Sequence, residues 1–140
     1  MEIFGAQEEH AHQGWVWLQM TSLPPRGVVK ITNLTTKRSV YCEALQIDAN
    51  FLRIYNQSPR RNITNPETTL VISEWYRAGL GGISTRTDVP LTIRACNSFF
   101  GQFLACIGHP QVVVRLAAWL GGIGLILGVI GLVLGIASLW

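Results

Sequence analysis

The last 25 residues of the 140-residue chain, 116–140, contain no charged side chain. Eighteen of them are apolar, six are Gly and one is Ser138. As a helix, this segment is about 37 Å long, which spans a hydrocarbon core of about 30 Å with some tilt. A chain of this size cannot surround such a helix on every side, which argues against a buried core helix. We expect residues 112–140 to form a transmembrane helix.

The flanks of this segment predict how it lies in a bilayer. Trp119 and Trp140 stand near its two ends, where indole rings favour the membrane interface, and Arg115 precedes it. Because positive charge marks the retained side of a membrane helix, we expect a single-pass protein whose N-terminal domain faces the cytoplasm. Residues 1–20 contain no cationic stretch followed by an apolar one, so we expect no signal peptide and the insertion mode of a tail-anchored protein.

Small residues recur along the segment at intervals of three and four. We call this stripe the glycine seam; its members are Gly121, Gly124, Gly128, Gly131, Gly135 and Ser138. Glycine in a helix costs about 1 kcal/mol relative to Ala, so five on one stripe indicate close approach of another helix in lipid. The chain has one such segment, so we expect a homo-oligomer. The alternatives are a different membrane partner, or glycines without a packing role.

The spacing of the glycine seam also predicts how the helices cross. A period of 3.5 residues favours a left-handed bundle. The pairs Gly124/Gly128 and Gly131/Gly135 also permit a crossed dimer of the GxxxG type.

The region before the membrane segment has the pattern of short strands. Alternating apolar residues predict strands at 14–20, 27–33 and 38–47, the last two forming a hairpin with a bulge near Ala44. Further strands are expected at 68–72 and 89–96, with a short helix capped by Ser73 between them. Residues 48–57 are ambiguous, and 58–67 are expected to be a loop. We expect residues 1–13 to be an N-terminal tail and 14–96 to be a β-barrel domain.

Residues 97–108 predict a further helix, capped by Asn97, whose apolar residues form one broad face without charge. At about 18 Å it is too short to span a bilayer. We therefore expect 97–111 to be an amphipathic juxtamembrane helix and an elbow, lying on the membrane surface or between neighbouring domains. The residues that we assign to the membrane interface are Phe99, Phe100, Phe103, Arg115, Trp119 and Trp140.

Two stretches of the chain are similar to a known fold family. Arg26-Gly-Val-Val-Lys-Ile-Thr-Asn-Leu-Thr-Thr-Lys-Arg-Ser-Val-Tyr-Cys-Glu-Ala-Leu resembles the opening strands of double-psi β-barrels, and 70–93 resembles their second psi motif. The resemblance covers about residues 26–96 and implies a mainly β fold, a small double-psi-like barrel with short helices. Catalytic members place an Asp after the second strand. Asp48 is the nearest candidate, but its neighbours do not match that motif, so the resemblance implies the barrel fold and leaves catalysis open.

No residue pattern indicates catalysis, a cofactor or a metal ion. Eleven Lys and Arg against eight Asp and Glu, mixed along the chain with a net charge of +3, form no nucleic-acid patch. Cys42, Cys96 and Cys106 lack metal-ligand spacing and predict reduced thiols. We therefore expect a protein that is not an enzyme, holds no cofactor or metal and binds no nucleic acid.

Four aromatic side chains are candidates for partner binding: Trp15, Trp17, Trp75 and Tyr76. They predict either a barrel core with a plug at its mouth, or the anchors of a protein-binding or inter-subunit surface. The whole pattern favours a non-enzymatic membrane scaffold or adaptor that self-assembles, contacts lipid and holds a cytoplasmic protein. The alternative is an oligomeric pore or hydrophobic tube for ions or a lipophilic molecule. A third hypothesis is a barrel enzyme that acts on polysaccharide or peptide through Asp48 or Asp88.

Overall fold

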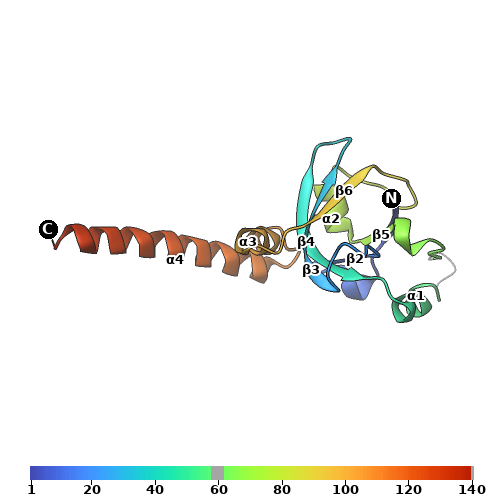
Figure 1. Cartoon of the computed structure of the whole chain (residues 1–140), viewed down its shortest axis with the longest axis horizontal. Coiled ribbons are helices and arrows are strands. Elements are labelled where there is room, and N and C mark those ends of the chain that lie inside the picture. The colour runs from blue at the N-terminus through green and yellow to red at the C-terminus, as the bar shows by residue number, and fades with distance from the viewer. Residues whose placement is uncertain (58–61, 140) are drawn as a thin grey trace.

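Six strands form one mixed sheet in the computed structural model, which describes residues 1–57 and 62–139 (Figure 1). The order across the sheet is β1-β5-β2-β4-β3-β6, with β1/β5 and β2/β4 parallel and the other neighbours antiparallel. The strand bounds are β1 Glu2–Gly5, β2 Trp15–Leu18, β3 Arg26–Asn33, β4 Ser39–Gln46, β5 Thr69–Ile72 and β6 Leu91–Ala95.

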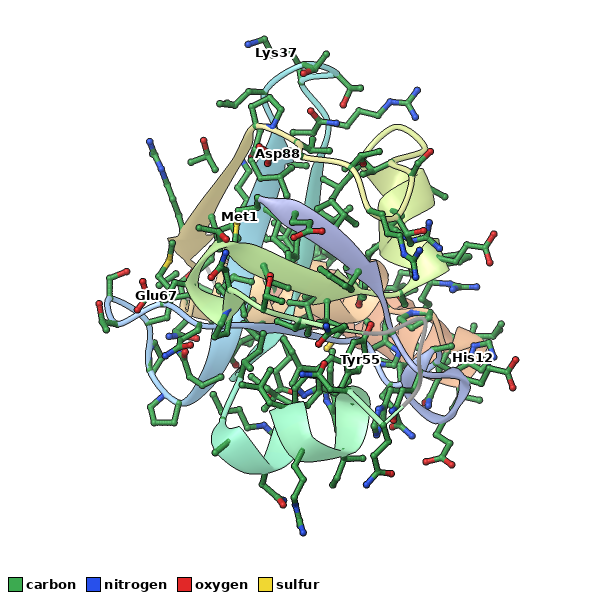
Figure 2. The ribbon with its side chains drawn as sticks, turned by 90° about the vertical axis from the view of Figure 1, so that its right-hand side faces the viewer. Met1, His12, Lys37, Tyr55, Glu67 and Asp88 are labelled. Carbon is green, nitrogen blue, oxygen red and sulfur yellow. The ribbon has the colours of Figure 1, made fainter. Side chains whose placement is uncertain are left out.

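The two edges of the sheet approach each other through the segment before β6. The amide of Ile3 in β1 donates to the carbonyl of Thr87 (3.1 Å), and the amide of Val89 donates to Met1 (3.0 Å). Figure 2 shows Met1 beside Asp88, whose carboxylate accepts a hydrogen bond from the Met1 amine at 2.7 Å. The sheet therefore curls toward a barrel, as the sequence predicts.

Alternation along the strands places the core on one face of β3, β4 and β6. Val29, Ile31 and Cys42 are buried, whereas the residues between them point to the other face. A second cluster packs Trp17 and Tyr55 under α1 (Ala49–Tyr55). The sheet thus has an inner face that holds the core and an outer face, on the side of α3 (Phe99–Ile107).

A side-chain cap starts α1 and α3 but neither α2 nor α4. Asp48 accepts a hydrogen bond from the Phe51 amide at 2.6 Å and starts α1, which resolves the ambiguous segment as helical. The short helix α2 (Glu74–Gly79) follows Ser73, whose hydroxyl makes no capping bond. Two short 3₁₀ turns, Glu8–His10 and Pro66–Thr68, complete the domain.

Four local predictions were wrong. Ser73 precedes α2 but does not cap it, because its hydroxyl bonds no amide of the helix. Residues 1–13 are not a tail, because β1 pairs with β5 and Ile3 is fully buried in the core. The hairpin of β3 and β4 has no bulge at Ala44, since the register runs unbroken through it. Asn97 does not cap α3: Ser98 accepts from the Gly101 amide, while the Asn97 side chain accepts from the amide of Val28. The predicted loop residues 58–61 lie outside the described part of the chain.

The long helix α4 (Val112–Ala137) leaves the domain on the outer side of the sheet, with α3 between the sheet and its free part (Figure 1). It is long and apolar enough to cross a membrane, and its most apolar stretch is not buried within the chain. The predicted architecture is confirmed at this level: a mainly β sheet domain with short helices, followed by a single long apolar helix.

Candidate functional site: the two faces of α4 and its junction with the sheet

The five glycines of the glycine seam face open space. A Cβ atom built at any of them would meet no other part of the chain within 4 Å. At about 100° per residue, all six members of the seam fall within an arc of about 100° on one side of α4. The seam is therefore an unoccupied surface of small residues. Its last member, Ser138, donates its hydroxyl to the carbonyl of Gly135 at 2.8 Å, so that hydroxyl is bonded within its own helix.

A second row of α4 residues is partly covered by the rest of the chain. Val114, Ala118 and Gly122 follow one another at four-residue intervals and are half-buried. A Cβ at Gly122 would stand 2.9 Å from the ring of Phe103, so this glycine admits the Phe103 side chain of α3. Gly122 lies about 150° around the helix from the middle of the glycine seam. Helix α3 thus packs on one side of α4 and leaves the seam free on the other.

The predicted interface aromatics do not share one environment. Phe99 and Phe100 in the first turn of α3 are 75% and 68% exposed, while Phe103 contacts α4. Trp119 lies exposed on α4, one turn before Gly122, and is thus at the level of α3. Trp140 lies outside the described part of the chain. The exposed rings therefore stand beside the first half of the apolar helix.

The elbow between α3 and α4 is held to the domain from two directions. Trp75 of α2 donates its indole N–H to the carbonyl of Gly108 at 2.9 Å. Arg115 donates to the carbonyls of His109 (2.8 Å) and Pro110 (3.1 Å). Its guanidinium also lies 4.8 Å from the centroid of the Trp75 ring. Arg115 therefore pairs two carbonyls of the elbow between α3 and α4, in addition to carrying the charge at the helix end.

His109 fastens the elbow to the loop before β2. Its Nδ1 accepts a hydrogen bond from the Gln111 amide (3.0 Å), so Nε2 carries the proton and donates to the carbonyl of Gln13 (3.2 Å). The neighbouring Gly14 has φ +74°, and a Cβ there would collide with the imidazole ring. Nδ1 thus holds the elbow itself, and Nε2 joins the elbow to a segment 96 residues earlier in the sequence.

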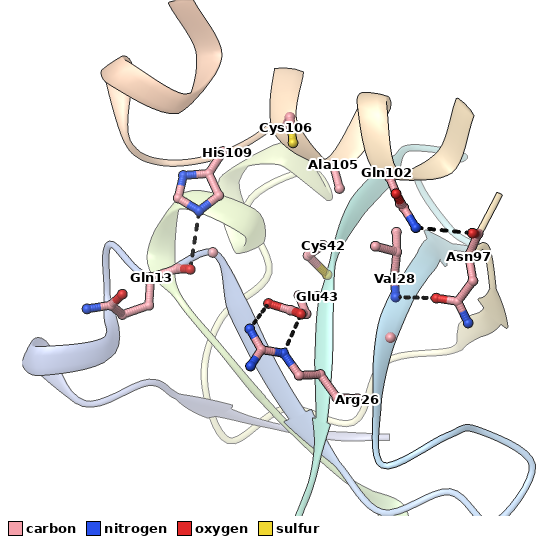
Figure 3. Close-up of a pocket in the computed structure, with 12 residues that line it drawn as sticks. Gln13, Arg26, Val28, Cys42, Glu43, Asn97, Gln102, Ala105, Cys106 and His109 are labelled. Atoms are coloured by element: carbon pink, nitrogen blue, oxygen red, sulfur yellow. Dashed lines mark hydrogen bonds and ion pairs between the residues drawn. The ribbon is translucent and has the colours of Figure 1, made fainter. Parts of the chain in front are cut away.

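A cavity of about 530 Å³ lies between α3 and the outer face of β3 and β4 (Figure 3). Arg26 and Glu43 face each other in it through two hydrogen bonds of 2.5 and 3.1 Å. Glu43 raises the pKa of Arg26, through this hydrogen bond first and its charge second. Asn97 bonds the Val28 amide at 2.7 Å and accepts from Gln102. The polar groups of this cavity are therefore paired with one another.

The buried titratable groups near this cavity are unsuited to acid–base or nucleophilic work. Burial raises the pKa of the Cys42 thiol well above its usual range, which keeps it protonated. Burial likewise raises the pKa of Tyr76, whose hydroxyl donates to the carbonyl of Gly14 at 3.3 Å. Both groups belong to the core.

The four aromatic candidates do not form one surface. Trp17 and Tyr76 are 6% and 2% exposed and pack in the core. Trp15 contacts Trp17 edge-on with centroids 6.2 Å apart. Trp75 is half exposed but belongs to the elbow. This burial leaves Trp17 and Tyr76 no side-chain surface for a partner.

The two carboxylates considered for catalysis lie apart and are already engaged. Asp48 caps α1, and Asp88 binds the Met1 amine, which lowers the Asp88 pKa. Within residues 1–57 and 62–139, no group of three His, Cys, Asp or Glu residues is placed to hold a metal ion. The ring of His10 packs against Trp17, with ring centroids 4.9 Å apart.

Sequence reasoning missed the junction. The four-residue spacing of Val114, Ala118 and Gly122 was a readable signal for helix packing. By contrast, no local pattern reveals that Trp75 and His109 hold the elbow, because their partners lie 33 and 96 residues away.

The comparisons with known proteins give a distant structural likeness. No protein-family model matches the chain, and no curated protein matches it. The structure is similar to the crystal structure of a rationally designed protein, mkDPBB_sym2, with a TM-score of 0.48 and 12% sequence identity, over 68% of this chain and 94% of that one. That protein is a double-psi β-barrel, the family that residues 26–96 resemble. A likeness this distant carries no argument about function.

Proposed function

We propose that this protein is a membrane-anchored scaffold whose copies assemble through the glycine seam and display the sheet domain at the cytoplasmic face. One observation carries the proposal: each of the five seam glycines meets open space, on the side of α4 opposite to α3. Each glycine weakens the isolated helix by about 1 kcal/mol relative to Ala, so the stripe favours a function that offsets that loss. Close backbone contact between helices in lipid supplies it.

The charges near the elbow support the cytoplasmic orientation. Arg115 lies at the domain end of α4, and residues 116–140 carry no charged side chain. The tendency of positive charge to stay in the cytoplasm favours a sheet domain on that side. Display of several domains in one assembly raises their effective concentration, which strengthens weak contacts with a cytoplasmic protein partner without any catalytic group.

The test is the mass of the full chain in mild detergent. Wild type should give one discrete oligomer, and Gly128→Ile should give a monomer, because a branched side chain keeps the helices apart. A Cβ at Gly128 meets no atom of its own chain within 4 Å. Loss of the oligomer in this variant would therefore report on the interface between chains alone. The matched control is Val129→Ile, which adds bulk at the next position, off the seam. An unchanged mass for Gly128→Ile would reject the proposal.

A leakage assay separates the scaffold from the pore hypothesis. Liposomes that carry the assembled wild-type chain should retain a small encapsulated dye at every protein density. Dye release that is lost in Gly128→Ile would instead identify the assembly as a pore.

A further inference from the structure

We propose that strands β3 and β6 carry a binding site for the phosphate of an anionic lipid headgroup, formed by Lys30, Arg94, Thr32 and Thr92. The inference deepens the proposed function in one respect: it rests on the domain lying beside a bilayer. It does not depend on assembly through the glycine seam.

The sheet register brings the four side chains together. Lys30 is the direct cross-strand partner of Arg94, and Thr32 is the direct partner of Thr92. Directly opposed residues of an antiparallel pair point to the same face, with Cβ atoms about 5 Å apart. Ile31, which lies between the two pairs, is fully buried in the core. The two cations and the two hydroxyls therefore share the outer face of the sheet.

The two cations have no anionic partner in the described part of the chain. The ion pairs found there join Met1 to Asp88 and Arg26 to Glu43. The Lys30 ammonium lies 5.6 Å from the centroid of the Tyr41 ring, a contact that leaves its charge unneutralised. Like charges placed directly opposite each other destabilise a sheet. A bound anion would remove this repulsion, so the arrangement favours a ligand of negative charge.

A small cavity marks the place of that ligand. It has a volume of about 210 Å³ and is lined by Lys30, Thr32, Leu34, Thr92 and Arg94. This volume is below the range of about 300–1,000 Å³ that is typical of sites for whole small molecules. Its polar lining offers the Lys30 ammonium, the Arg94 guanidinium and the Thr92 hydroxyl as donors, which suit the oxygens of a phosphate. The Thr32 hydroxyl shares a hydrogen bond of 2.8 Å with the Ser39 hydroxyl, and it can donate to the phosphate as well when Ser39 is the donor of that bond. The cavity thus fits one charged group better than a complete nucleotide or sugar.

The site faces the side on which α4 leaves the domain. Leu104 and Ile107 of α3 line a cavity together with Tyr41, which stands opposite Lys30 in the register of β3 and β4. Helix α3 therefore lies on the same outer face as the cation pair, and Figure 1 shows α4 running away from that face. A bilayer crossed by α4 would lie in front of Lys30 and Arg94, and the exposed Phe99 and Phe100 belong to α3, on the same outer side of the sheet.

This placement selects a lipid headgroup over a free phosphate. Cations close to an anionic membrane surface gain from its negative potential, and a headgroup held in the bilayer is presented at high local concentration. A free anion would have to bind to two partly solvated cations without either advantage.

The experiment measures lipid binding to the full chain by native mass spectrometry from detergent micelles. The probes are dioleoyl phosphatidic acid, dioleoyl phosphatidylcholine and inorganic phosphate. Wild type should retain phosphatidic acid, and the double variant Lys30→Gln/Arg94→Gln should bind it about thirtyfold more weakly, as expected for the loss of two cations near the surface. The matched control is Lys37→Gln/Arg53→Gln, which removes two exposed cations elsewhere in the domain and should bind as wild type does.

Each outcome decides the proposal. Equal weakening in both double variants would show attraction by net charge alone and would overturn the site. Equal binding of phosphatidylcholine by wild type would overturn its anionic specificity. Displacement of phosphatidic acid by inorganic phosphate at similar concentration would identify a free-anion site instead. A melting temperature of Lys30→Gln/Arg94→Gln that is no lower than that of wild type shows that the domain is folded, because the variant also removes the repulsion between the two cations. The same spectra report the oligomer, so a monomer that retains phosphatidic acid would reject assembly and keep the headgroup site.

Discussion

Gly101 in α3 and Gly128 in α4 are both helical glycines, but their surroundings differ. A Cβ at Gly101 would collide with the carbonyl of Cys96, whereas one at Gly128 would meet no atom within 4 Å. In the sheet domain, glycine allows two parts of one chain to touch. Along the glycine seam it creates a surface that the chain itself leaves uncovered. The contrast separates residues that determine folding from residues available for assembly.

The largest effect is expected where the chain touches itself. Gly101→Ala places a methyl group against the backbone of Cys96, which cannot move aside as a flexible side chain would. Overpacking of this kind should destabilise the domain by about 2 kcal/mol, measured by thermal unfolding. The control Gly128→Ala should leave the unfolding of the domain unchanged. Equal melting temperatures for the two variants would remove the distinction between the two kinds of glycine.

Two adjacent residues of α4 give a sharper test of the same distinction between the two kinds of glycine. Gly122→Leu would crowd the ring of Phe103 and loosen α3 by about 1 kcal/mol, a small effect because the ring can shift. Gly121→Leu adds the same side chain one position earlier, on the glycine seam. Hydrogen exchange in α3 should rise for Gly122→Leu alone, and the oligomer should be lost for Gly121→Leu alone. Loss of the oligomer in both variants would mean that α3 takes part in assembly.

The sequence predicted elements whose signal is local. Alternation in Val29 and Ile31 gave the β3–β4 hairpin, and the uncharged run after Arg115 gave the long helix, because side-chain periodicity follows directly from strand and helix geometry. The strand β1 was missed, since its four residues pair in parallel with β5, 67 positions later. Such pairing is fixed by tertiary packing, which a short stretch of sequence does not encode.

The candidate sites divide in the same way. The glycine seam was readable because all its members lie on one helix. The cation pair of Lys30 and Arg94 was not, because it exists only once β6 has paired with β3 in the observed register. The elbow contacts of Trp75 and His109 likewise join elements that the fold alone brings together.

The smallest expected effect is the response to acid, which should differ between the sheet domain and the glycine seam. The Met1 amine lowers the pKa of Asp88 below its usual 3.8, by its hydrogen bond first and its charge second. A carboxyl whose pKa is lower in the folded state adds stability above its unfolded pKa, and this is lost as pH falls through the folded pKa. Asp88→Asn should therefore have a slightly lower melting temperature than wild type at pH 6 and the same melting temperature near pH 2. The difference should be small because the Asp88 carboxylate is exposed to solvent.

The glycine seam should not respond to the same change of pH. Residues 116–140 carry no titratable side chain. Between pH 6 and pH 3, the mass of the assembly in detergent should therefore stay constant while the melting temperature of the domain falls. Dissociation of wild type between pH 6 and pH 3 would show that titrating groups of the domain contribute to the interface. Repeating the titration with Lys30→Gln/Arg94→Gln would then identify whether the cation pair on the outer face of the sheet takes part in that contact.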